Sequence, residues 1–240
     1  MEFGTADYYI IGELVACWGS FLICINIFLT FSLYDRRQRF FLYASAATLF
    51  AAVFNIASVH LFAVFNTVPV WLNEIVTTSY FFVLLITPFV MSIYVFDIAF
   101  SDHKKKNLFT SIGGIIQTLY MLFVLANIKT GWIFYYDKVN GYTRGPLKNI
   151  TYILTSIYGL SIVLIVLIQR KFLARRITWV FILYPFISFC FVVIQFFYPK
   201  IVLTGVASFT SVLFAYLTIQ SYTMEINLAT GLMNESRLRK

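Results

Sequence analysis

The chain has 240 residues, of which 60% are hydrophobic, 20% aromatic and only 12% charged. This composition excludes a water-soluble globular protein, because a domain of this size cannot bury so much apolar surface and lipid must cover the rest. The formal net charge of +8 comes from Lys and Arg clusters at the ends of apolar stretches, so it indicates orientation in a membrane and not nucleic-acid binding.

A membrane-spanning helix needs roughly 20 mostly apolar residues, and seven such stretches follow one another. We therefore expect one all-α domain, an integral membrane seven-helix bundle. The expected spans are residues 9–33, 40–65, 71–96, 108–128, 150–168, 177–197 and 201–221. Pro88 removes a backbone donor from the third span and should kink it. In the second span a narrow stripe of small residues favours close helix packing; it consists of Ala44, Thr48, Ala51, Asn55 and Ser58.

The only long connection runs from Lys129 to Asn149, and its glycines and proline are typical of a loop or hairpin. Its aromatic residues are expected either to form a lid over an outer opening or to anchor the chain at the membrane surface. These residues, with one acid among them, are Trp132, Tyr135, Tyr136, Asp137 and Tyr142.

The Lys and Arg residues are distributed unevenly among the connections. The first, third and fifth connections hold ten (Arg36, Arg37, Arg39, Lys104, Lys105, Lys106, Arg170, Lys171, Arg175 and Arg176), and the others hold five (Lys129, Lys138, Arg144, Lys148 and Lys200). The positive-inside rule places the richer side in the cytoplasm. With seven spans, the N-terminus is expected outside and the C-terminus in the cytoplasm.

Three ionisable residues are expected at similar depth near the outer surface: Glu13, His60 and Glu74. Because ionisable groups are costly in lipid, one hypothesis is that they face the bundle interior and outline a ligand site between helices. The alternative is that His60 pairs with an acid, or that the side chains reach the headgroups. The other expected ligand-binding residues are Asn73, Thr77, Gln117, Tyr120, Asn127, Tyr152 and Gln195.

No catalytic constellation occurs in the chain, and neither a phosphate-binding loop nor a nucleophile elbow is present. We expect no catalytic residue, metal or cofactor. The seventh span has no interior lysine, which excludes a retinal Schiff base, and the motifs of eukaryotic G-protein-coupled receptors are missing from the third and seventh spans.

After the seventh span comes Asn227-Leu228-Ala229-Thr230-Gly231-Leu232-Met233-Asn234-Glu235, which resembles Asp-x-Leu-Thr-Gly-Leu-x-Asn-Arg, the opening signature of a GGDEF domain. Thr230, Gly231, Leu232 and Asn234 match, whereas Asn227, Ala229 and Glu235 depart from it. The long connection, from Gly131 to Tyr136 and from Arg144 to Pro146, also resembles outer loops of bacterial seven-span sensors attached to such domains.

The resemblance implies a bacterial membrane receptor truncated at the start of its output domain. Residues 1–5 have the sequence of a cloning remnant, residues 6–222 would be the sensor, and residues 223–240 a cytoplasmic linker with the start of the GGDEF-like domain. The expected signalling residues of the linker are Tyr222, Glu225, Asn227, Thr230, Gly231, Leu232 and Asn234.

By this resemblance the fragment would not be an enzyme, while the full-length protein would be a diguanylate cyclase or a degenerate relative. The protein would be a homodimer in the bacterial cytoplasmic (inner) membrane and would bind a small extracellular ligand. The alternative is a transporter or channel with a polar site near the outer face, which requires polar groups through the core to the inner face.

Overall fold

The computed structural model describes residues 9–30, 36–100, 102–137, 141–198 and 200–225. These residues are mostly helical, with one short antiparallel hairpin. The helices are α1 (Ile11–Thr30), α2 (Arg36–Ala63), the 3-10 turn η1 (Phe65–Thr67), α3 (Val70–Leu84), α4 (Ile86–Ala99), α5 (His103–Thr130), α6 (Ile150–Ile168), α7 (Arg175–Phe197) and α8 (Thr204–Glu225), and the strands are β1 (Phe134–Asp137) and β2 (Gly141–Arg144).

Among the described residues, six helices are long and apolar enough to cross a membrane. They are Ile11–Leu29, Gln38–Ala63, Val70–Ala99, His103–Thr130, Ile150–Ile168 and Arg175–Gln195. In helix α8, the apolar stretch over Thr204–Gln220 is shorter than the six spans. Many large apolar side chains on these helices are exposed, among them Trp18, Leu122 and Phe186. The structure is therefore that of a multi-pass helical membrane protein.

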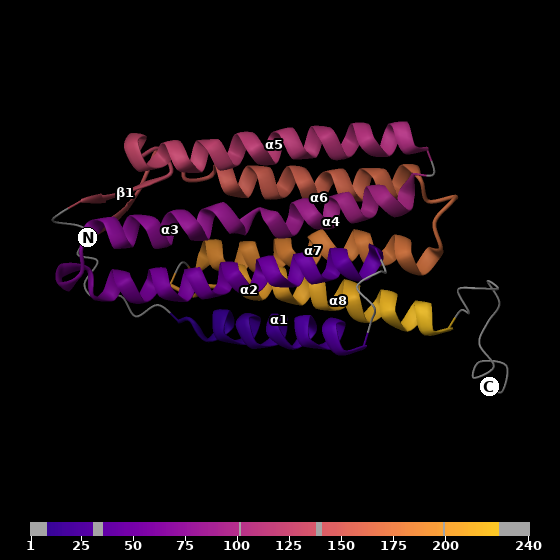
Figure 1. Ribbon diagram of the computed structural model, residues 1–240, viewed down its shortest axis with the longest axis horizontal. Coiled ribbons are helices and arrows are strands. Elements are labelled where there is room, and N and C mark those ends of the chain that lie inside the picture. The colour runs from indigo at the N-terminus through magenta and orange to yellow at the C-terminus, as the bar shows by residue number, and fades with distance from the viewer. Residues whose placement is uncertain (1–8, 31–35, 101, 138–140, 199, 226–240) are drawn as a thin grey trace.

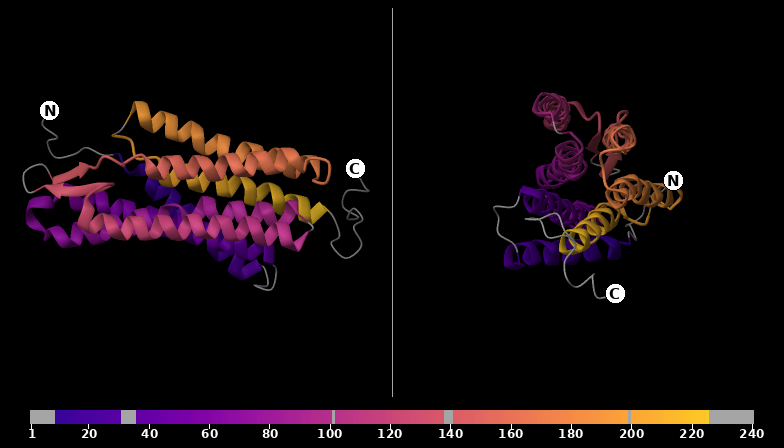
Figure 2. Two further views of the ribbon diagram at one scale, coloured as in Figure 1. Left: turned by 90° about the horizontal axis from the view of Figure 1, so that it is seen from above. Right: turned by 90° about the vertical axis from the view of Figure 1, so that its right-hand side faces the viewer.

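The helices lie lengthwise beside one another, and α2 occupies the middle, where it contacts α1, α3, α4 and α8 (Figures 1 and 2). The expected small-residue stripe on α2 is buried along its whole length, as close helix packing requires. Near its middle, the Thr48 hydroxyl donates to the Ala44 carbonyl at 2.9 Å and lies 3.1 Å from the Thr87 hydroxyl of α4.

The third expected span is present but interrupted. Helix α3 ends at Leu84 and α4 begins at Ile86, with Leu85 between them in a turn. The interruption lies three residues before Pro88, whose ring and missing N–H disturb the preceding turn of a helix. The expected kink is confirmed.

The long connection, expected as a loop or hairpin, forms a hairpin at one end of the bundle (Figure 1). Phe134 pairs with Arg144 and Asp137 with Gly141 in an antiparallel register. Gly131 ends α5 with a φ of 64°, and Gly141 begins β2 with a φ of 66°, a left-handed conformation that glycine adopts without strain.

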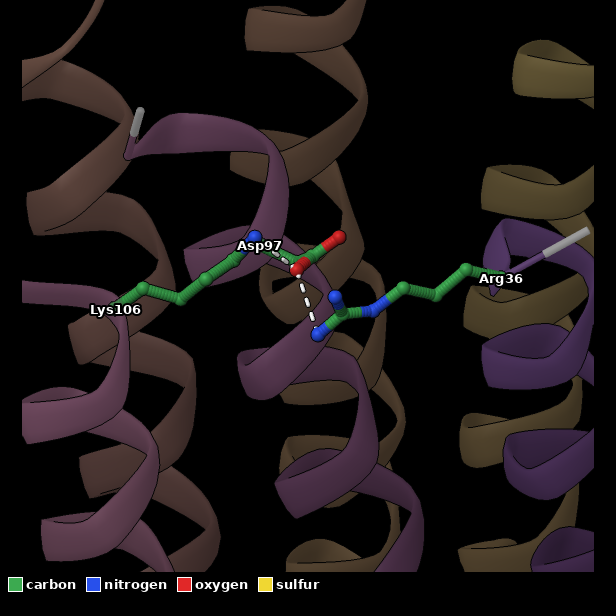
Figure 3. A network of polar contacts seen from close by, with 3 residues as sticks. All are labelled: Arg36, Asp97 and Lys106. Carbon is green, nitrogen blue, oxygen red and sulfur yellow. Dashed lines mark ion pairs between the residues drawn. The ribbon is translucent and has the colours of Figure 1, made fainter. Parts of the chain in front are cut away.

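The opposite half of the bundle is closed by an apolar core. Phe41, Tyr94 and Phe181 make edge-to-face ring contacts there, and all three are buried. At the far end, Asp97 of α4 pairs with Arg36 of α2 at 2.9 Å and with Lys106 of α5 (Figure 3). Three helices are thereby joined through one carboxylate.

Candidate functional site

A cavity of about 140 Å³ lies beneath the hairpin, between five helices. Helix α2 contributes Asn55, Ser58, Val59 and Phe62, and α3 contributes Thr77, Tyr80, Phe81 and Leu84. The remaining lining comes from the hairpin and the helices beyond it: Ile133, Tyr142, Arg144, Lys148, Asn149, Thr151, Tyr152, Gln195, Val202 and Thr204. Apolar walls with a few convergent polar groups are typical of small-ligand sites.

Two hydroxyl groups of the cavity lining belong to a chain of three that ends in the hairpin. Ser58 of α2 lies 2.8 Å from the Thr77 hydroxyl of α3, which in turn lies 2.7 Å from the phenol of Tyr136 in the hairpin. Burial raises the pKa of Tyr136, so its phenol keeps the proton that it needs to donate a hydrogen bond. The hairpin is thus fastened to two helices of the bundle.

The start of α8 forms part of the opposite wall. Gln195 Oε1 of α7 accepts hydrogen bonds from the Leu203 amide at 3.3 Å and from the Thr204 hydroxyl at 3.2 Å. Next along the chain, the Gly205 amide donates to Glu13 Oε1 of α1 at 2.8 Å. Two side chains from other helices therefore satisfy N-terminal donors of α8 that have no partner within the helix.

The segments that precede α1 and α8 are also paired. Tyr9 donates its amide to the Lys200 carbonyl at 3.0 Å and accepts from the Val202 amide at 3.2 Å. Together with the contact between Glu13 and Gly205, this pairing holds the starts of the two helices side by side, next to the cavity.

Two cationic side chains line the cavity from the hairpin side. Arg144 ends β2, and Lys148 lies in the turn before α6. Both side chains are exposed, and neither forms an ion pair within the described part of the chain.

Of the ten expected ligand-binding residues, the structure brings three into this cavity: Thr77, Tyr152 and Gln195. Glu13 is completely buried and lies behind the lining, where it faces the cavity residues Asn55 and Tyr80.

The three ionisable residues expected in one layer do not meet. Glu13 is held between α1 and α8, and His60 is exposed on α2. Glu74 lines a different groove, of about 390 Å³, between α3, the end of α5 and the hairpin. Similar depth was the basis of the expectation, but the direction of a side chain depends on rotation about the helix axis, which depth does not determine.

The other expected residues have structural partners. Asn127, which also borders the groove, accepts from the Ile133 amide at 2.6 Å and donates to the Phe134 carbonyl at 3.0 Å. It therefore joins the hairpin to α5. Tyr120 donates to the Phe81 carbonyl at 3.0 Å, Gln117 lies 3.5 Å from the Tyr158 phenol, and Asn73 bonds weakly to the Pro69 carbonyl at 3.4 Å.

The expected signalling residues are described only in part. Helix α8 extends through Tyr222 to Glu225, and nothing is described of these two side chains. Asn227, Thr230, Gly231, Leu232 and Asn234 lie outside the described residues.

Several cavity residues were not expected from the sequence, chiefly Tyr80, Arg144, Lys148 and Thr204. A periodic signal was nevertheless present. The lining residues of α2 and those of α3 each follow the spacing i, i+3, i+4, i+7, which places them on one helix face. Mostly polar or aromatic residues at this spacing on two consecutive spans indicate two helix faces that form walls of one cavity.

Comparison of the chain with protein-family models, with curated proteins and with solved structures finds no match.

Proposed function

We propose that this chain is the sensor domain of a bacterial membrane receptor, which binds a small extracellular ligand in the cavity beneath the hairpin. The ligand acts on the start of α8, and α8 transmits the effect to a cytoplasmic output domain of the GGDEF type. The observation that carries the proposal is that Thr204, the first residue of α8, lines the cavity while α8 runs to the other end of the bundle.

A ligand in the cavity contacts groups that hold α8 in position. Gln195 lines the cavity and also accepts the two hydrogen bonds from Leu203 and Thr204. A ligand that competes for this amide favours a different position of α8, and its differential affinity for the two positions sets the size of the response. The hairpin, bonded through Tyr136 to Thr77, acts as the outer cover of the site.

In this proposal α8 is the seventh pass through the membrane. With seven passes, the start of α1 and the end of α8 face opposite sides. The Lys- and Arg-rich connections lie at the end away from the hairpin, so the hairpin faces outward and α8 ends in the cytoplasm. The partial GGDEF signature after α8 supports this orientation, and it implies a homodimer in the bacterial inner membrane with α8 near its axis.

The alternative function, a transporter or channel, requires a polar route from the cavity to the far end. The packing of the far half disfavours such a route, because buried apolar side chains of α1, α2, α4, α6, α7 and α8 fill it. Phe41 lies in edge-to-face contact with both Tyr94 and Tyr216 in this core. The observations therefore favour a receptor over a conduit.

The decisive experiment uses the natural gene. Its sequence is read past the codon for Lys240, and the full-length protein is expressed in a bacterium that carries a fluorescent cyclic di-GMP reporter. The cavity is then filled with Leu84→Trp, and the matched control is Leu122→Trp, at a residue of α5 that is 58% exposed. Immunoblotting of membranes ensures that the variants are compared at equal abundance.

We expect the gene to continue into a cyclase-like domain. Leu84→Trp should change the reporter signal several-fold in either direction, and Leu122→Trp should leave it unchanged. A stop codon directly after Lys240, or a reporter signal that Leu84→Trp does not alter, contradicts the receptor function and makes flux measurements in vesicles the next step.

A further inference from the structure

The charged side chains that line the cavity are cationic. Two cationic side chains, Arg144 and Lys148, contribute to its lining, and among the described residues no Asp or Glu does so. The acid Glu13 lies behind the lining and already accepts the Gly205 amide. The acid Glu74 lines the other groove. A ligand in the cavity therefore meets uncompensated positive charge at the hairpin side.

The positive charge is reinforced by the backbone. Helix α6 begins at Ile150, and the residues at its start, Asn149, Thr151 and Tyr152, line the cavity. The N-terminal end of a helix carries a partial positive charge, which favours an anionic group nearby. This contribution adds to the two side-chain cations.

The remaining walls suit an aromatic ring. Phe62 stacks on Tyr142 with ring centroids 4.7 Å apart and an interplanar angle of 27°, and Tyr80 and Phe81 face them from α3. The volume of about 140 Å³ matches a single ring, since an apolar cavity of about 150 Å³ accommodates benzene. Rings pack favourably in such offset or edge-to-face arrangements.

We propose that the ligand of this cavity is a small monocyclic aromatic anion of the arylcarboxylate class. Its ring packs against the stacked pair of Phe62 and Tyr142 and against Phe81, and its carboxylate is paired with Arg144 and Lys148. This inference rests on the proposed function for its physiological role, but the binding step is tested on the purified protein alone.

The test compares three probes that share one ring and differ in charge: benzoate, benzamide and benzylamine. Their dissociation constants are measured by isothermal titration calorimetry on the detergent-purified chain at low ionic strength, and a thermal melt with each probe provides a second readout. The variants are Arg144→Gln and Lys148→Gln. Lys129→Gln is the matched control, because Lys129 is an exposed cation near the hairpin that lines the other groove.

We expect benzoate to bind at least about tenfold more tightly than benzamide, and benzylamine not to bind measurably. Arg144→Gln and Lys148→Gln should each weaken benzoate binding about five- to tenfold, whereas Lys129→Gln should change it less than twofold. Benzoate should also raise the midpoint of thermal unfolding, and this rise should be lost in the double variant.

Equal or tighter binding of benzamide or benzylamine overturns the proposal, as does the absence of benzoate binding up to about 10 mM. The same holds if Lys129→Gln weakens benzoate as much as Arg144→Gln does. None of these results decides the receptor function, which is tested separately by the reporter response to Leu84→Trp without any added ligand.

Discussion

The close approach of α1 and α8 at Gly205 makes the substitution Gly205→Ala a sensitive probe of the bundle. A Cβ atom at this position would lie 2.1 Å from Glu13 Oε2 and 3.2 Å from the Cβ of Ala16. The Glu13 carboxyl would have to move out of its 2.8 Å hydrogen bond with the Gly205 amide. Since Glu13 is completely buried, no solvent compensates for this loss.

The expected magnitude follows from three contributions. Loss of a hydrogen bond to a buried charged or acidic group costs about 1.5–3 kcal/mol, and overpacking a tight contact costs about 1–3 kcal/mol. Replacing glycine by alanine in a helix returns about 0.5–1 kcal/mol. The net destabilisation is about 2–5 kcal/mol, which corresponds to a fall of about 4–20 °C in the unfolding midpoint of a chain of this size.

The assay is thermal unfolding in detergent, followed by intrinsic fluorescence, within a double-mutant cycle that includes Glu13→Ala. Removal of the Glu13 side chain leaves space for the new methyl group, so the effect of Gly205→Ala should largely disappear in that background. The matched control is Gly114→Ala, because a Cβ there meets no atom within 4 Å. Equal midpoints for Gly205→Ala and Gly114→Ala, or additive effects in the cycle, would refute the reasoning.

Three further substitutions test other contacts. Tyr136→Phe removes the hydrogen bond to Thr77 and should cost about 1 kcal/mol; faster hydrogen exchange in the hairpin than in α3 is the expected signature, and unchanged exchange speaks against the contact. Gly145→Ala places a Cβ 2.3 Å from the Trp132 carbonyl oxygen, a backbone atom that cannot move aside, so the hairpin should become sensitive to protease at a cost of about 2 kcal/mol or more; a protease-resistant variant would disprove this contact. Asp97→Asn weakens the pairing with Arg36 and Lys106 and should lower stability by about 1–2 kcal/mol, by less as salt increases; a salt-independent difference would exclude an ionic origin.

The features that local chemistry determines could be predicted from the sequence. The missing donor of Pro88 predicts a kink, which the structure contains as the interruption at Leu85. The glycines and proline of the long connection predict a loop or hairpin, and the structure contains a hairpin. The buried stripe on α2 follows from small residues spaced at helical intervals. Each of these features depends on a few neighbouring residues.

The candidate site could be predicted only in part, because it depends on how helices rotate against one another. Thr77, Tyr152 and Gln195 line the cavity as expected, but Asn127 uses its amide to hold the hairpin. A polar residue in a membrane helix satisfies the same physical requirement whether its partner is a ligand or the backbone of a neighbouring segment. The sequence contains no signal that separates these two cases.

The contact between Glu13 and Gly205 also has a consequence for how the protein is made. The acid belongs to α1, whereas its partner belongs to α8 and is synthesised 192 residues later. Until α8 has been inserted, α1 carries an acid without this partner, and an acid in the bilayer costs up to about 2.5–3.5 kcal/mol, the value at the bilayer centre. Full stabilisation of α1 is therefore conditional on synthesis of α8, and chains that stop before α8 should be degraded faster by membrane proteases than the complete bundle.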